Sequence, residues 1–274
     1  MNHIISDETT LAFIIKQINS YYNGGDIIEL EVQFRDYSTY LNEKKNNGYY
    51  DKQIKFYKDI FNCEFISLNL PKLDEAKELV NNHEQNQEVG IYEKKNIDLK
   101  LCSLINEYTI HNKFSKYAFF FTIYGFIISK YSGQDVIYTS VINTKRNIRY
   151  VENMIDMFAS TLPLLLKYDN KNESFENVIK NNMNVLMNMF DNQDLSLTEI
   201  NHSLKLPRIN NTLIYQQKII LNNDLEKSIF MENEKNCVTS VMDNSNANSN
   251  IYDLSNFDIT FSNVREGYRI SNFH

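Results

Sequence analysis

Apolar residues recur with helical spacing along much of the chain. A short apolar segment at residues 3–6 predicts a strand, and the residues after it predict a helix. Asp7 or Thr9 can cap this helix, and the pair Gly24 and Gly25 can end it. Its apolar face consists of Leu11, Ile14, Ile15, Ile18 and Tyr22. The same spacing predicts further helices over residues 32–44, 51–62, 98–107, 115–130, 149–157 and 175–190.

Strand patterns lie mainly in the second half of the chain. They predict strands over residues 135–143, 160–168, 212–221 and 257–262. Residues 69–96 show little periodicity and contain Pro71, which predicts a connection between two lobes, and the polar run at 242–250 predicts a loop. Because helices and strands mix without strict alternation, the pattern favours an α+β fold. A chain of 274 residues is long enough for one large domain or two lobes.

Composition and charge argue against several classes of function. The formal net charge of −7 argues against a general nucleic-acid binder, which usually carries a basic stripe. The three cysteines lack the spacing of a metal site or a disulfide framework, and they favour a reducing, cytoplasmic compartment. The most apolar run, residues 117–128, is shorter than the roughly 20 residues that cross a bilayer. We therefore expect no bound metal and neither nucleic acid nor membrane as a partner.

Several short motifs follow one another in a fixed order. They are NHIISDE at residues 2–8, FRDYSTY at 34–40, YSGQ at 131–134 followed by a strand with Val141 and Arg146, IDMFASTLP at 155–163, NQDLSLT at 192–198 and NFDITFS at 256–262. In this order they resemble the motifs HHxxxDG, YxDYAxW, YSGQ with V-x-N-R, (I/V)GxFVNTLP, (H/N)QDxPFE and KFDLTL of the condensation domain of nonribosomal peptide synthetases. The resemblance runs over nearly the whole chain.

This resemblance implies the chloramphenicol-acetyltransferase-like fold, in which a channel lies between two lobes. Residues 1–70 would be a remnant of the N-terminal lobe, residues 71–97 the inter-lobe connection and residues 98–274 the C-terminal lobe. We expect the first lobe to be incomplete, because relatives have a substantial segment before HHxxxDG. We expect the second lobe to be largely present but truncated at its end. Apolar faces left uncovered in such a chain predict self-association.

The resemblance also implies a reaction. Condensation domains join two groups held as thioesters on the phosphopantetheine arms of carrier proteins, and they bind no cofactor directly. His3 corresponds to the second histidine of the family motif, whose imidazole suits proton transfer or positioning of the attacking amine. Asp7 corresponds to a structural aspartate, and Arg146, from the second lobe, is its candidate ion-pair partner. Peptidyl carrier proteins and adjacent synthetase domains are the expected partners.

Other motif positions are expected at or near the channel: Asn2, Glu8, Phe158, Ser160 and Thr161. Several residues depart from the family pattern: Asn2 for the first His, Glu8 for Gly, Asp156 for Gly, Ser160 for Asn and Ser196 for Pro. The negative charge of Glu8 would raise the pKa of a nearby histidine, and Ser160 would shorten or lose a hydrogen bond of the amide it replaces. A second hypothesis therefore stays open. The chain can be a noncatalytic remnant, or a lobe that docks carrier domains or complements a separately encoded N-terminal lobe.

Plainer interpretations stand beside these roles. Asp7 can be a helix N-cap and Arg146 a surface charge. Asp36 and Asp194 are expected to be solvated or capping carboxylates. The remaining histidines have no partner spacing and are expected to be structural or exposed: His83, His111, His202 and His274.

Overall fold

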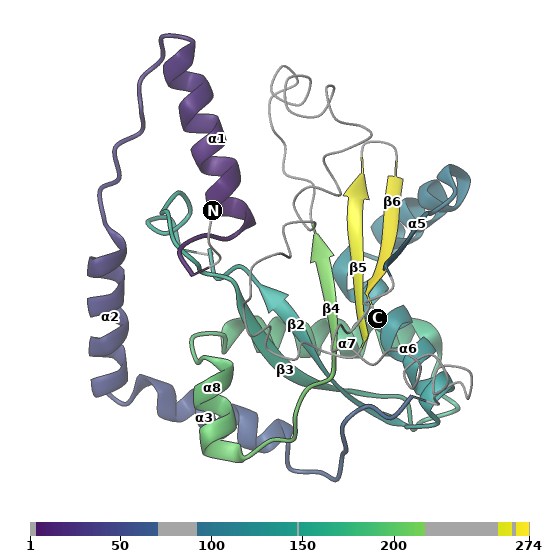
Figure 1. The fold of residues 1–274 in the computed structure, drawn as a ribbon. Helices are drawn as coiled ribbons and strands as arrows, with labels where there is room; N and C mark the ends of the chain where they lie inside the picture. The colour runs from purple at the N-terminus through teal and green to yellow at the C-terminus, as the bar shows by residue number, and fades with distance from the viewer. Residues whose placement is uncertain (1–3, 71–91, 147, 217–256, 265–266, 274) are drawn as a thin grey trace, which may run out of the picture. The chain divides into compact units, whose positions relative to one another are not determined.

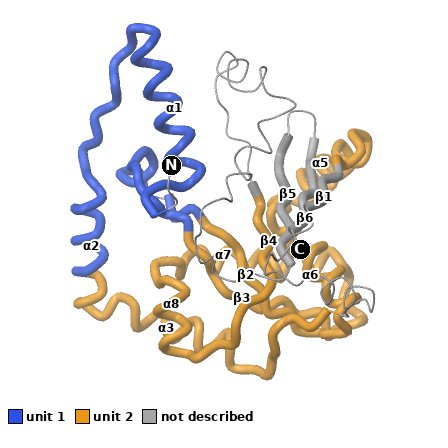
Figure 2. The backbone as a smooth tube through the Cα atoms, in the orientation of Figure 1, with its two compact units in different colours: residues 1–43, 144–159, 218–254 blue, residues 44–143, 160–217, 255–274 orange. Residues whose placement is uncertain are grey.

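The protein is assembled from two compact units, each made of three chain segments. The computed structural model describes residues 4–70, 92–146, 148–216, 257–264 and 267–273 (Figure 1). Unit 1 comprises residues 1–43, 144–159 and 218–254, and unit 2 comprises residues 44–143, 160–217 and 255–274 (Figure 2). Helices and a mixed sheet together confirm the predicted α+β class.

Unit 2 is built on a six-stranded sheet with the strand order β1-β6-β5-β4-β2-β3. The strands are β1 (Tyr92–Asn96), β2 (Val136–Asn143), β3 (Ser160–Lys167), β4 (Asn211–Gln216), β5 (Phe257–Val264) and β6 (Gly267–Phe273). β4 runs parallel to β2 and β5, and the other neighbours are antiparallel. β2 and β3 pair over their full length, so that Asn143 at the end of β2 faces Ser160 at the start of β3.

Five described helices accompany this sheet: α3 (Tyr49–Ile60), α5 (Leu99–His111), α6 (Lys116–Ser132), α7 (Phe175–Asp191) and α8 (Leu197–Leu204). α6 and α7 pack against each other and against the sheet (Figure 1). The core between them holds the fully buried side chains of Phe121, Tyr124 and Leu164. Apolar residues 117–128 therefore form a buried helix of the core, as the sequence predicts.

A glycine allows α6 to lie close to β3. An added Cβ at Gly125 would come within 2.4 Å of both Leu166 Cδ1 and the Tyr168 hydroxyl oxygen. That hydroxyl donates a hydrogen bond to the Thr122 carbonyl at 2.9 Å, and Asn182 on α7 donates to the Thr122 hydroxyl at 3.1 Å. Because α6 and β3 lie this close, the buried polar groups of Thr122, Tyr168 and Asn182 form hydrogen bonds with one another.

Unit 1 contains α1 (Glu8–Tyr22), most of α2 (Phe34–Asn46) and the segment 144–159. Segment 144–159 leaves β2 and returns to β3, so both of its ends are continuous with paired strands. Val151, Met154 and Phe158 of this segment form a small buried cluster, against which Val32 and Tyr37 pack.

Most predicted helices and strands are found within a few residues of their expected limits, but three elements were missed. The strands β1 and β6 and the short helix α8 have no counterpart in the prediction. β1 lies inside the range expected to be irregular, while residues 71–91 of the predicted connection lie outside the described residues. The end of the predicted strand at 212–221 and the loop predicted at 242–250 also lie outside the described residues. The predicted lobe boundaries stay a prediction.

Two predicted elements are wrong. Residues 4–6 do not form a strand, because Ser6 and Asp7 turn inward to begin α1 while Ile4 and Ile5 are exposed. The helix expected at 149–157 is replaced by turns. There the carbonyls of Val151, Glu152 and Met154 accept hydrogen bonds from Arg146. This side-chain donor takes the place that helical N–H groups would fill.

Candidate functional site: the Asp7–Arg146 network

Asp7 lies at the start of α1 and is buried, with 5% of its side chain exposed. It is the N-cap of the helix, and its Oδ1 accepts the Thr10 N–H at 2.8 Å. Its Oδ2 accepts the Phe158 N–H at 3.1 Å. The carboxylate therefore caps the N-terminus of α1 through Thr10 and also binds the backbone of segment 144–159 through Phe158.

Arg146 supplies the positive charge that this buried carboxylate requires. Arg146 Nη2 lies 2.9 Å from Asp7 Oδ1 and 3.1 Å from Oδ2, and Nε lies 3.3 Å from Oδ2. The guanidinium side chain is also 5% exposed. Arg146 and Asp7 belong to the same compact unit, unit 1. The ion pair therefore joins two residues that are 139 positions apart in the sequence.

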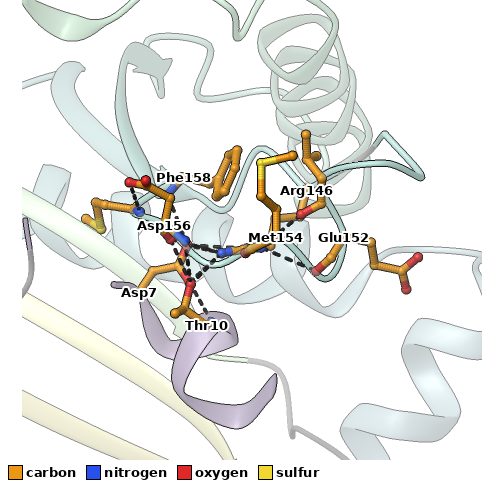
Figure 3. A network of polar contacts seen from close by, with 9 residues as sticks. Asp7, Thr10, Arg146, Glu152, Met154, Asp156 and Phe158 are labelled. Atoms are coloured by element: carbon orange, nitrogen blue, oxygen red, sulfur yellow. Dashed lines mark hydrogen bonds and ion pairs between the residues drawn. The ribbon is translucent and has the colours of Figure 1, made fainter. Parts of the chain in front are cut away.

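The other guanidinium nitrogen binds backbone carbonyls (Figure 3). Nη1 donates to Val151 O at 2.9 Å, Met154 O at 2.7 Å and Glu152 O at 3.3 Å. Lys145, immediately before, has a left-handed φ of 52°, an uncommon conformation for a residue other than glycine. A planar donor with five N–H groups suits this arrangement, and lysine would not reproduce it.

An aromatic cluster covers the network. The Arg146 guanidinium carbon lies 4.4 Å from the centre of the Phe158 ring, a cation–π contact. Phe34 and Tyr37 of α2 lie against the same ring, with centroid distances of 5.8 and 5.4 Å. Segment 34–40, which resembles YxDYAxW, therefore contributes side chains that pack around the ring in contact with Arg146.

Neighbouring acids at this site have pKa values shifted in opposite directions. Burial alone would raise the pKa of Asp7, but the hydrogen bonds from Thr10, Arg146 and Phe158 outweigh it, and the pKa is lowered. The Glu8 residue is exposed overall, yet partial desolvation of its carboxyl and the charge of Asp7 raise its pKa. Asp7 is therefore held as a carboxylate, whereas Glu8 gains a proton more readily than usual.

The structure brings some of the predicted site residues together and separates others. Asp7, Arg146 and Phe158 are in direct contact. Ser160 and Thr161 lie at the start of β3 in unit 2, where Ser160 Oγ is buried and has no hydrogen-bond partner among the described residues. Asn2 and His3 lie outside the described residues, so their roles stay predictions.

The segment that resembles (H/N)QDxPFE has a structural role in unit 2. Asp194 accepts from Gln53 at 3.2 Å and pairs with Lys44 at 3.4 Å, while Gln193 bonds the side chain of Asn143 at the end of β2. Ser196 caps α8 together with Glu199. Asp194 thus binds side chains on α2 and α3, which differs from the solvated or capping role expected for it.

Thr10 and the backbone of Asp156 were missed by the sequence reasoning. The Thr10 hydroxyl donates to Asp156 O at 2.7 Å and accepts from Arg146 Nη2 at 2.8 Å. A threonine in the first turn of a helix, three residues after a capping aspartate, gives no signal of such a long-range contact. Residue type and spacing alone would have predicted a helical position with no further role.

Comparison with known proteins identifies the family. A model of the condensation domain matches residues 1–271. The chain belongs to the condensation-domain family. It is 26% identical over 208 residues to surfactin synthase subunit 1 of Bacillus subtilis (strain 168), an alignment that covers 76% of this chain and 6% of that protein. The chain therefore spans a small part of its curated relatives.

Solved structures of a condensation domain and of an epimerization domain share the fold. The condensation domain of the monacolin K polyketide synthase MokA superposes with a TM-score of 0.75 at 12% identity, covering 98% of this chain and 61% of that one. The epimerization domain from the third module of tyrocidine synthetase B gives 0.68 at 11% identity, covering 100% and 62%. These likenesses confirm the chloramphenicol-acetyltransferase-like fold.

No described helix is long and apolar enough to cross a bilayer. The described residues also contain no group of three His, Cys, Asp or Glu side chains placed to hold a metal ion.

Proposed function

We propose that this chain acts as a condensation domain that forms an amide bond between aminoacyl or peptidyl groups carried on phosphopantetheine. The amine of the acceptor attacks the thioester carbonyl of the donor, a C–N bond forms and the C–S bond breaks. The released arm leaves as a thiol after taking up the proton lost by the amine. Both arms enter as parts of substrates and belong to peptidyl carrier proteins, which we propose as partners together with adjacent synthetase domains.

The observation that carries the proposal is the network at the start of α1. Four donor groups bind the Asp7 carboxylate, namely the N–H groups of Thr10 and Phe158 and the Nε and Nη2 of Arg146. The motif residues 2–6 come directly before it. His3 lies four residues before this anchored position, and we assign it the role of proton acceptor or positioning group for the amine. A catalytic group needs its neighbouring element held in place, and the network around Asp7 holds the start of α1.

The ion pair expected from the family motif is retained although other motif positions differ. Asp7 and Arg146 form their pair although Glu8 and Asp156 replace the two glycines of the family pattern. Cys63 and Cys102 are free, which supports a reducing compartment such as the cytoplasm. The substitutions at residues 2, 8 and 160 are consistent with the alternative hypothesis of a noncatalytic docking lobe, and the following experiment separates the two.

The test is an amide-formation assay with loaded carriers. The chain is mixed with a donor carrier bearing an aminoacyl thioester and an acceptor carrier bearing a second amino acid, and the dipeptidyl carrier is measured by intact mass. We expect His3→Ala to lower the rate by about 10²–10⁴-fold, the usual contribution of a general acid or base. His202→Ala, an exposed position on α8, is the matched control and should retain the wild-type rate.

Each outcome has a defined meaning. Equal product from wild type and His3→Ala removes His3 from the mechanism. Absence of product from wild type, with carrier binding retained in the same mixture, contradicts amide formation and favours the docking hypothesis.

A further inference from the structure

Thr10 uses the full hydrogen-bonding capacity of its hydroxyl. The residue is completely buried. Its Oγ1 donates to Asp156 O at 2.7 Å and accepts from Arg146 Nη2 at 2.8 Å and from the Asp156 N–H at 3.3 Å (Figure 3). A hydroxyl has one proton and two lone pairs, so nothing of this group is left unused.

This behaviour differs from that of three other threonines in helices. Thr39, Thr109 and Thr122 each donate to the carbonyl four residues earlier in their own helix. That local bond is the ordinary choice of a threonine inside a helix. Thr10 instead donates to a residue 146 positions away in the sequence. The hydroxyl therefore serves a contact between segments and not the helix to which it belongs.

The contact joins the three parts on which the anchored helix start depends. Thr10 belongs to the first turn of α1, Arg146 opens segment 144–159, and Asp156 lies near its end. Arg146 Nη2 divides its protons among Asp7, Thr10 and the Asp156 carbonyl. Without the hydroxyl, a buried guanidinium N–H and the Asp156 N–H would both face a methyl group, which is costly in a site closed to water.

We propose that Thr10 is a positioning residue for the condensation reaction. Its hydroxyl fixes the orientation of Arg146 relative to α1, and thereby fixes the helix start that follows the motif containing His3. Asp7 supplies the charge that holds Arg146, and Thr10 supplies the directional contact that sets its rotation. This inference rests on the proposed function, because the readout of positioning is the rate of amide formation.

The kinetic test compares three variants in the loaded-carrier assay. Thr10→Val preserves shape and removes the hydroxyl, Thr10→Ser preserves the hydroxyl, and Thr9→Val changes a neighbouring threonine that is only partly buried. We expect Thr10→Val to lower kcat at least tenfold, with the carrier concentration at half-maximal rate changed less than twofold. Thr10→Ser should recover kcat to within threefold of wild type, and Thr9→Val should match wild type.

A second measurement does not require activity. Hydrogen exchange followed by mass spectrometry on peptides covering residues 4–13 and 150–158 should accelerate in Thr10→Val and stay unchanged in Thr9→Val. If wild type forms amide but Thr10→Val keeps its kcat, the positioning role is wrong. If wild type forms no amide, the proposed function fails, and the exchange data alone decide whether Thr10 joins the segments. Should Thr10→Val not fold, Thr10→Ser and Thr10→Ala, which differ by one oxygen atom, replace it in both measurements.

Discussion

At the scale of single residues, one carboxylate fulfils two roles that the sequence predicted for it separately. Asp7 is the N-cap of α1 and also the partner of Arg146, because its two oxygens accept from different donors. A carboxylate has about four acceptor positions, so a cap and a bidentate arginine can share it. Residue type and position predicted both contacts separately, but only the fold shows that they coincide.

The opposite pKa shifts of Asp7 and Glu8 predict opposite effects of pH. The pKa of Asp7 is lowered from its ordinary 3.8, so its ionised form stabilises the fold above pH 3.8, and this stabilisation is lost as pH falls through the lower folded value. The pKa of Glu8 is raised from 4.5, so its ionised form costs stability at neutral pH, and the cost disappears as pH falls below 4.5.

We therefore expect Asp7→Asn to destabilise unit 1 at pH 7 and Glu8→Gln to stabilise it slightly. Both differences from wild type should shrink as the pH is lowered toward 3. Urea unfolding between pH 3 and pH 8, followed through hydrogen exchange at α1, measures them. Glu29→Gln, at an exposed position of the same unit, is the control. Differences of the same sign for the two variants at pH 7 would contradict the assigned shifts.

At the scale of elements, the approach of α6 to β3 depends on the absence of a side chain at Gly125. Helix propensity alone favours alanine over glycine by about 1 kcal/mol in a helix interior. The added Cβ would instead meet Leu166 and the Tyr168 hydroxyl at 2.4 Å. Leu166 is fully buried, and Tyr168 is held by its bond to Thr122, so neither can move aside freely.

We predict that Gly125→Ala lowers the free energy of unfolding by about 1–3 kcal/mol, the usual cost of overpacking a core. Lys130→Ala, at an exposed position of the same helix, should change it by less than about 0.5 kcal/mol. The measurement is a urea unfolding curve followed through hydrogen exchange of peptides from α6 and α7. A more stable Gly125→Ala variant would show that propensity outweighs the close contact.

The elements that the sequence predicted correctly are those whose own pattern determines them. α1, α6 and α7 have long apolar faces and capping residues at Asp7, Ser115 and Ser174. α8 has only eight residues, too few for a clear periodic pattern. Segment 149–157 has a helical spacing, but Arg146 takes up its carbonyls from elsewhere in the chain. A contact of this kind cannot be read from local spacing.

At the scale of the whole molecule, the family and the order of its motifs could be predicted, whereas the joining of the motifs could not. Motif segments 2–8, 34–40 and 155–163 contribute Asp7, Phe34 and Phe158 to one network in unit 1. Segment 192–198 instead forms hydrogen bonds with α3 and with the end of β2 in unit 2. Motif order gives no information about which segments meet, because contacts across more than a hundred residues depend on chain topology.

That topology predicts an order of unfolding. Segment 144–159 begins and ends at β2 and β3, whose terminal residues Asn143 and Ser160 face each other. Separation of these strands releases both ends of the segment that holds Arg146. Loss of the Asp7–Arg146 pair, by contrast, releases α1 and the segment without opening a strand pair. Unit 1 should therefore depend on the sheet of unit 2, while the sheet should not depend on the ion pair.

We expect Arg146→Ala to lower the free energy of opening at α1 by about 3–5 kcal/mol, because it leaves Asp7 buried and unpaired. Exchange protection of α6 should stay at the wild-type level. Leu164→Ala, at a fully buried position of β3, should lower protection in α1 and α6 together, by about 2–5 kcal/mol. Arg149→Ala, at an exposed position three residues from Arg146, is the control. Native-state hydrogen exchange on peptides from both helices decides the matter, since an equal loss of protection in α6 for Arg146→Ala would mean that the two units unfold as one.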